Sequence, residues 1–319
     1  KSFVIDRRKL TPNVGPDKYA PILMALPTIK SNSFKIELEA LEGTFNSKAK
    51  GQNWHLAEIE ISEAAGLENF PEKTLGKMHP TPFPAGDSYL WKPQDAIDND
   101  LLKISKNTVV DISDKLDKHG NIVWNAPEGE WTIQRYGMTP TGTKNSPSAP
   151  QGKGYEIDKM DEELIRFHFD QFVGKLLSKV PEENRSAFKY VIADSYEMGS
   201  QNWSDNFQKE FENIYGYDPK PFLPTYTGRI VESVEASERF LWDMRRFVAD
   251  QVAYEYVGGL RKISNEHNLQ LWLENYGHWG FPSEFLKYGG QSDLVSGEFW
   301  NEGTLGDIEC KSASSAAHI

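Results

Sequence analysis

Cysteine is nearly absent from this chain of 319 residues, and Cys310 is its single example. A disulfide within the chain, a cysteine-based zinc site and a paired-cysteine redox motif are therefore excluded. Long apolar runs are also missing. No stretch approaches about 18 consecutive apolar residues, so no segment is expected to cross a membrane as a helix.

Basic clusters and nucleotide-binding motifs are lacking as well. The chain holds 47 acidic and 35 basic residues, for a net charge of −12, and no Lys/Arg stripe forms. Nucleic acids and anionic membrane surfaces are therefore not expected as partners. The sequence has no glycine-rich dinucleotide loop, P-loop or His-Glu-x-x-His pair, and no Gly-x-Ser-x-Gly nucleophile elbow.

Aromatic residues, in contrast, are abundant. They make up 12% of the chain, with 9 Trp and 13 Tyr. Sugar rings stack on aromatic faces, whereas a large core also consumes aromatic side chains. Composition alone leaves both interpretations open.

The first part of the chain, residues 1–129, is predicted to be a β-rich insertion or accessory region that resembles a small β-sandwich. Its short alternating runs indicate strands, and a further run lies just beyond it. A proline-rich stretch from Pro71 to Pro93 is predicted to be irregular surface chain. The predicted strands are residues 33–40, 56–61, 108–112, 122–124 and 131–136.

The second part, residues 130–319, alternates helices and strands, which indicates a parallel α/β sheet. Helices are predicted after an N-cap at either Asp158 or Asp161, and near 205–215 and 235–266. For Asp158, a role as a cap is favoured over a functional role. Strands are predicted at 190–193, where burial is expected, and at 269–273 and 294–295. Long helices and aromatic-rich strand ends favour part of a (β/α)8 TIM-type barrel over a dinucleotide-binding sheet.

Each of these three strands is followed by a carboxylate accompanied by glycine and aromatic residues. Active sites of (β/α)8 barrels lie at the carboxyl ends of the strands. A single acid after a strand is usually a helix cap or a solvated loop residue, but three in succession favour a site. The three segments are Asp194-Ser195-Tyr196-Glu197-Met198-Gly199, Glu274-Asn275-Tyr276-Gly277-His278-Trp279-Gly280 and Glu298-Phe299-Trp300-Asn301-Glu302.

Glycoside hydrolysis uses such carboxylates in pairs. One carboxyl protonates the leaving oxygen, and the other attacks the sugar or activates water; a separation of about 5–5.5 Å gives retention and roughly 6.5–9.5 Å inversion. Apolar neighbours favour the protonated acid by desolvation. Glu298 precedes Phe299 and Trp300, and Glu197 lies between Tyr196 and Met198, so Glu197 and Glu298 are the predicted catalytic residues.

The remaining strand-end residues have a functional and a structural interpretation each. Asp194, Glu274, His278 and Trp300 are predicted to bind the sugar, although loop anchoring and core packing are alternatives. Glu274 and Asn275 carry the oxygen ligands that a hard cation prefers, and core hydrogen bonding is the alternative. Trp203 and Trp279 could also stack on sugar, but core packing is the favoured interpretation for these rings.

Several stretches carry a family resemblance by their order and spacing, namely residues 135–142, 156–160, 194–203, 216–219, 239–243, 298–300 and 311–319. Together they resemble glycoside hydrolase family 106, the α-L-rhamnosidases, over about residues 130 to 319. The region before 130 resembles the β-rich insertion of that family only loosely.

The resemblance implies inverting hydrolysis of terminal α-L-rhamnose from pectin or related plant glycans. It also implies a calcium ion at the sugar hydroxyls, a periplasmic, extracellular or cell-surface location, and active-site roles for Glu197 and Glu298. The chain is expected to be an internal segment of a longer protein, because fewer than eight barrel strands can be counted. Alternatives are a barrel glycosidase of β-galactosidase-like specificity and a non-catalytic glycan-binding protein.

Overall fold

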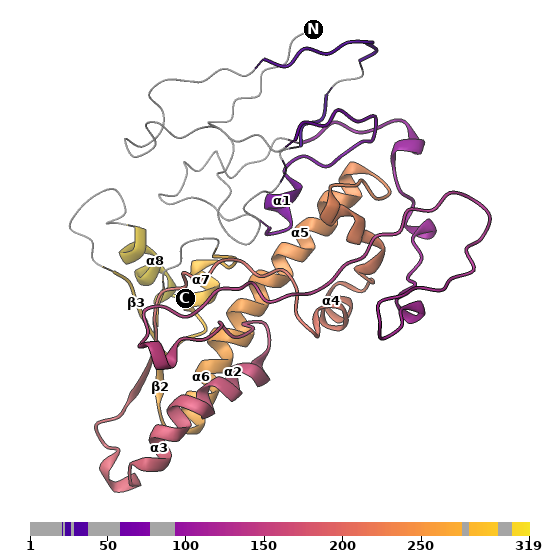
Figure 1. Cartoon of the computed structure of the whole chain (residues 1–319). Coiled ribbons are helices and arrows are strands. Elements are labelled where there is room, and N and C mark those ends of the chain that lie inside the picture. The colour runs from indigo at the N-terminus through magenta and orange to yellow at the C-terminus, as the bar shows by residue number, and fades with distance from the viewer. Residues whose placement is uncertain are drawn as a thin grey trace.

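The computed structural model describes residues 21, 23–26, 29–37, 58–76, 93–275, 281–298 and 308–319 (Figure 1). The fold is a mixed α/β arrangement. The α-helices are α1 (Phe70–Lys73), α2 (Glu162–Phe169), α3 (Lys175–Lys179), α4 (Phe207–Tyr215), α5 (Val234–Gln251), α6 (Gly259–Glu266), α7 (Phe285–Gly289) and α8 (Ile308–Ala316). The 3-10 segments are Asp100–Leu102, Lys106–Thr108, Ser113–Lys115, Pro150–Gly152, Glu182–Asn184 and Lys220–Thr227. No helix within the described ranges is both long enough and apolar enough to cross a membrane.

Three parallel strands form the sheet in the order β1 (Tyr190–Ala193), β2 (Gln270–Glu274) and β3 (Leu294–Ser296). These strands confirm the three predicted from the sequence. In the register, Ala193 is opposite Leu273, and Glu274 is opposite Ser296. The carboxyl ends of all three strands therefore lie at the same edge of the sheet.

The two faces of this sheet differ in burial. Leu271, Leu273 and Ala193 lie on one face and are buried against the helices, with α6 contacting β2 and α8 contacting β3. The opposite face carries Ile192, which is 65% exposed, and Trp272, which is 38% exposed. The prediction that 190–193 is a buried strand is therefore wrong for this face, because helices cover only the other one.

A long, nearly continuous helix supplies most of the core. It runs through α5, a π-helical segment (Val252–Gly258) and α6, and confirms the helix predicted over 235–266. The hydroxyl of Ser233 caps its start by accepting from Ala236 N. The predicted apolar face is buried along its whole length, at Phe240, Leu241, Met244, Phe247, Val248, Val252, Leu260 and Ile263.

The helix before β1 runs through α2, a π-helical segment (Asp170–Gly174) and α3, and α2 packs along α6 (Figure 1). Asp161 is its N-cap and accepts from Glu163 N and Leu164 N. Asp158, the other predicted cap, instead accepts from Met160 N and from the side chain of Gln201. A carboxylate one turn too early cannot reach the first free N–H groups of the helix.

The predicted strands of the first part are not found among the described residues. Within the described ranges, segments 108–112, 122–124 and 131–136 have no strand partner, and the isolated bridge Leu116↔Ile122 is the one pairing that involves them. Alternation gives each segment one apolar face but does not by itself supply the hydrogen-bonding neighbour that a strand needs. The same holds for residues 33–37 and 58–61, whereas 38–40 and 56–57 lie outside the described residues.

Residues 64–76 are anchored to the second part of the chain. Leu67 N donates to Gly228 O at 2.8 Å, and Leu67 belongs to the same core as α5. Buried Lys73 forms an ion pair with Glu238 at 2.5 Å, so the start of the proline-rich stretch is helix α1 rather than irregular surface chain. The proposed division at residue 129 stays a prediction.

Candidate active site

The turn after β1, residues 194–201, brings the first carboxylates to the sheet edge. Asp194 and Glu197 are both exposed there. The hydroxyl of Ser195 donates to Glu197 Oε1 at 3.2 Å, and Ser195 N donates to Asp194 Oδ1 at 3.1 Å. We call residues 194–201 the β1 turn.

Glu274, the last residue of β2, joins this group across the sheet. Its Oε2 accepts from Ser195 N at 2.9 Å, a contact between two strand ends 79 residues apart in sequence. Its carboxyl also lies within hydrogen-bonding reach of Asp194. A single serine therefore connects the carboxylates of Glu197, Asp194 and Glu274.

The pKa of Glu274 is raised from its ordinary value of 4.5 to about 7. Partial burial is the largest cause, because it disfavours the charged form. The hydrogen bond to Asp194 and the negative charges of Asp194 and Glu298 act in the same direction. A pKa of about 7 leaves an appreciable share of Glu274 protonated at neutral pH, which is the state that a carboxyl acid needs in order to donate a proton.

Glu298 completes the cluster from the third strand end. It follows β3 by two residues, is half-buried, and acts on the pKa of Glu274 through its charge. The structure thus brings Asp194 and Glu298 close to Glu274, and Ser195 connects Glu197 to the same group. All four carboxylates extend from the strand ends at one edge of the sheet.

The predicted metal pair, Glu274 and Asn275, is separated by the alternation of the strand. Asn275 is fully buried, and its Nδ2 donates to Ser312 O at 3.3 Å on the face covered by α8. Glu274 points to the other face, toward Ser195 and Asp194. Adjacent residues of one extended segment point in opposite directions, so the two side chains do not meet at one ion.

Oxygen donors of the kind that calcium prefers are present in the cluster, but their number is small. In the part of the chain that the structure describes, no three His, Cys, Asp or Glu side chains are grouped as a metal site.

His278 and Trp300, both predicted to bind the sugar, lie outside the described residues, as does Trp279.

Trp203 belongs to the core, as its favoured interpretation held. Its ring stacks on Phe207 with centroids 4.1 Å apart and an interplanar angle of 16°.

Ser195 is a site residue that was not predicted from the sequence. Its position between two acids in Asp194-Ser195-Tyr196-Glu197 was the available signal, since a small donor there can reach both neighbours.

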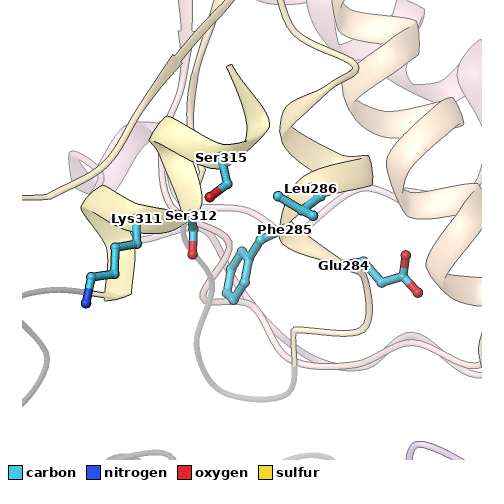
Figure 2. Close-up of a pocket in the computed structure, with 6 residues that line it drawn as sticks. All are labelled: Glu284, Phe285, Leu286, Lys311, Ser312 and Ser315. Carbon is cyan, nitrogen blue, oxygen red and sulfur yellow. The ribbon is translucent and has the colours of Figure 1, made fainter. Parts of the chain in front are cut away.

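A separate cavity of about 450 Å³ lies between α7 and α8 (Figure 2). The figure shows Phe285 and Leu286 of α7 facing Ser312 and Ser315 of α8, with Lys311 and Glu284 at its margins. None of the four clustered carboxylates lines this cavity, so it is distinct from the strand-end cluster.

Comparison with known proteins agrees with this geometry. A family model described as alpha-L-rhamnosidase, glycoside hydrolase family 106, matches residues 10–319. The structure of a rhamnosidase from Novosphingobium sp. PP1Y superposes with a TM-score of 0.67 at 25% identity, covering 82% of this chain and 25% of that one.

A curated relative from Formosa agariphila, provisionally named a beta-glucuronidase, is 36% identical over 216 residues, which are 68% of this chain. The chain spans only 18% of that relative and 25% of the rhamnosidase. The match over residues 10–319 nevertheless establishes the family. This chain belongs to glycoside hydrolase family 106, the α-L-rhamnosidase family.

Proposed function

We propose that the full-length protein hydrolyses terminal α-L-rhamnose from pectin or related plant glycans, with inversion at the anomeric carbon. The observation that carries this proposal is the cluster of Asp194, Glu197, Glu274 and Glu298 at three neighbouring strand ends. Family membership and the rhamnosidase fold support the choice of sugar.

We assign the catalytic roles to Glu197 and Glu298, one as acid and one as base. Asp194 and Glu274 then hold sugar hydroxyls, together with His278 and Trp300. In its protonated form Glu274 can donate a hydrogen bond to a sugar oxygen, whereas the Asp194 carboxylate can accept one from a sugar hydroxyl. The pair can therefore bind two neighbouring hydroxyl groups of the sugar in a defined orientation.

The raised pKa also makes Glu274 a competing candidate for the acid. To find out which residue is the acid, the turnover of rhamnosides with different leaving groups is compared between variants. Loss of the acid slows a poor leaving group, such as an alkyl alcohol, far more than p-nitrophenol, which departs without protonation. Whichever of Glu197→Gln, Glu298→Gln and Glu274→Gln shows that selective loss has lost the acid.

We further propose that the sheet is an arc of a (β/α)8 barrel. Helices bury one face, at Leu271 and Leu273, and leave Ile192, Trp272 and Leu294 on the other. An open doubly wound sheet is covered by helices on both faces, whereas the inner face of a barrel is covered by its own other strands. The β-sandwich-like insertion predicted for residues 1–129 stays part of this proposal.

Calcium and an extracytoplasmic location complete the proposal. Asp194 and Glu298 act on Glu274 through their negative charges, and a divalent cation bound by carboxylate oxygens would offset that charge. Its ligands would include Asp194, or Glu274 in its deprotonated form. We assign no catalytic step to the ion.

A periplasmic or cell-surface location is consistent with a polysaccharide substrate and is tested by fractionating the source cells.

The test is a panel of p-nitrophenyl glycosides offered to the full-length enzyme, with and without EDTA. We expect release from the α-L-rhamnoside, loss with EDTA and recovery with added calcium. The β-D-glucuronide and β-D-galactoside should not be cleaved, and the glucuronide adds a carboxylate to a site that already holds four. Cleavage of the glucuronide alone would support the activity in the name of the Formosa agariphila relative instead.

A further inference from the structure

Lys159 is a buried lysine beside the β1 turn. It is 5% exposed, and its Nζ lies 2.6 Å from Glu156 Oε2. The same nitrogen lies 5.6 Å from the ring centroid of Tyr196 and 5.6 Å from that of Tyr256. Lysine is seldom buried unless its charge is compensated, and here a carboxylate and two aromatic faces compensate it.

Tyr196 connects this lysine to the predicted catalytic residue that follows it. Its ring is buried and packs edge-on against Phe281, with centroids 5.5 Å apart. Its hydroxyl donates to Gly199 O at 2.8 Å, which closes the backbone around Glu197. Gly199 has a φ of +85°, a conformation that glycine adopts without strain, so it suits this tight closure.

The segment that carries Lys159 also holds the far end of the β1 turn. Lys159 N donates to Gln201 Oε1 at 3.2 Å, and Gln201 Nε2 donates to Asp158 Oδ1 at 2.6 Å. Residues 158 and 159 therefore contact the turn on both sides of Glu197, through Tyr196 before it and Gln201 after it.

We propose that Lys159 is a positioning residue for Glu197. Its charge holds the ring of Tyr196 in place, and Tyr196 fixes the backbone from which the Glu197 carboxylate extends toward the strand-end cluster. Glu156 neutralises the lysine without taking part in the reaction. This inference rests on the proposed glycosidase function, and Lys159 itself touches neither substrate nor reacting atoms.

The test compares Lys159→Met with the double variant Glu156→Gln/Lys159→Met in the full-length enzyme. The single variant leaves the Glu156 carboxylate without its partner and should lower the thermal midpoint, whereas the double variant removes both charges and should restore it. Turnover should fall about a hundredfold in both, since misplacing a catalytic group by about 1 Å costs that much. KM should change less than turnover, because Glu274, which is proposed to hold the sugar, lies on β2 and outside the β1 turn.

Lys262→Met is the matched control. Lys262 is an exposed lysine paired with Glu162 at 2.5 Å, and its replacement should leave turnover unchanged. Recovery of wild-type turnover by the double variant would overturn the proposal, because the pair would then serve folding alone. Wild-type turnover in Lys159→Met would overturn it as well.

Hydrogen–deuterium exchange of the peptide covering residues 194–203 gives a readout that needs no activity. We expect faster exchange in both Lys159 variants and none of this effect in Lys262→Met. If the wild type cleaves no glycoside, the proposed function fails while the exchange result still decides the positioning role. Unchanged exchange in both variants, with or without a loss of turnover, would contradict it.

Discussion

At the scale of single residues, the site depends on one serine and one glutamate that share a hydrogen bond. Ser195 N donates to Glu274 Oε2, and the Ser195 hydroxyl reaches Glu197. The sequence indicated that acids would gather at these strand ends because parallel strands end at a common edge. It could not indicate which acid would be protonated, because that depends on the distances to Asp194 and Glu298 and on burial.

The raised pKa of Glu274 predicts a pH-dependent cost in stability. An acid whose pKa is higher in the folded protein makes the protein less stable as the pH rises from 4.5 to about 7, because in this range the unfolded state has released a proton that the folded state still binds. Glu274→Gln should therefore stabilise the protein above pH 7, by about 1 kcal/mol once solvent screening is counted.

The glutamine oxygen can still accept from Ser195 N, and its amide can donate to Asp194. Below pH 4.5 both states of the wild type hold the proton, so the advantage should vanish. Urea unfolding at the two pH values measures this difference. If Glu274→Gln changed the free energy of unfolding equally at the two pH values, the pKa of Glu274 would not be raised in the folded state.

Close packing at Gly289 leads to a second prediction at this scale. A Cβ there would lie 2.7 Å from Asn275 Nδ2 and 2.8 Å from Ala316 Cβ, so Gly289→Ala should destabilise by about 1–3 kcal/mol. Gly258→Ala is the matched control, since its Cβ would meet nothing closer than 3.7 Å. Chemical denaturation compares the two, and an equal tolerance would refute the tight contact of α7 with α8.

At the scale of elements, helices and strands of the second part were predictable because their apolar residues repeat with a clear period. Phe240, Met244 and Phe247 illustrate this on α5, where one face is buried throughout. Strands of the first part were not predictable in this way. A period of two fixes the face of each side chain but not the presence of a partner, and Val123 remains 83% exposed.

The cap of α2 gives a prediction that separates Asp161 from its neighbours. Asp161 accepts from two N–H groups at the helix start, so Asp161→Ala should lower the free energy of unfolding by about 1 kcal/mol. Glu163→Ala removes an acid from the same turn without removing the cap, and it should lower the free energy of unfolding by only about 0.3 kcal/mol. Equal losses measured by urea unfolding would contradict the cap.

At the scale of the whole molecule, the open face of the sheet is the feature that links fold to site. The clustered carboxylates stand at the end of the face that carries Ile192 and Trp272, the face that a barrel would enclose. The sequence resemblance indicated a partial barrel. Whether further strands enclose this face could not be predicted from these three strands, because it depends on residues outside them.

The barrel proposal predicts that a charge at Ile192 is costly in the full-length enzyme. Enclosed by other strands, Ile192→Lys would bury an unpaired charge and destabilise by about 3 kcal/mol or more. Ile214→Lys, on the exposed side of α4 at 58% exposure, should change stability by less than about 0.5 kcal/mol. Thermal unfolding checks both, and a tolerated lysine at position 192 would place that face in solvent.

The most direct test of the central claim is the turnover of methyl α-L-rhamnoside, whose poor leaving group needs protonation, by the full-length Glu197→Gln and Glu298→Gln variants. We expect kcat to fall by about 10²–10⁴-fold in each, with an unchanged thermal midpoint, because each change removes a proton-transfer group and little packing. Glu163→Gln, the same change on an exposed helix turn, should keep full turnover. Near-normal turnover in both strand-end variants would contradict the assignment of the active site to this cluster.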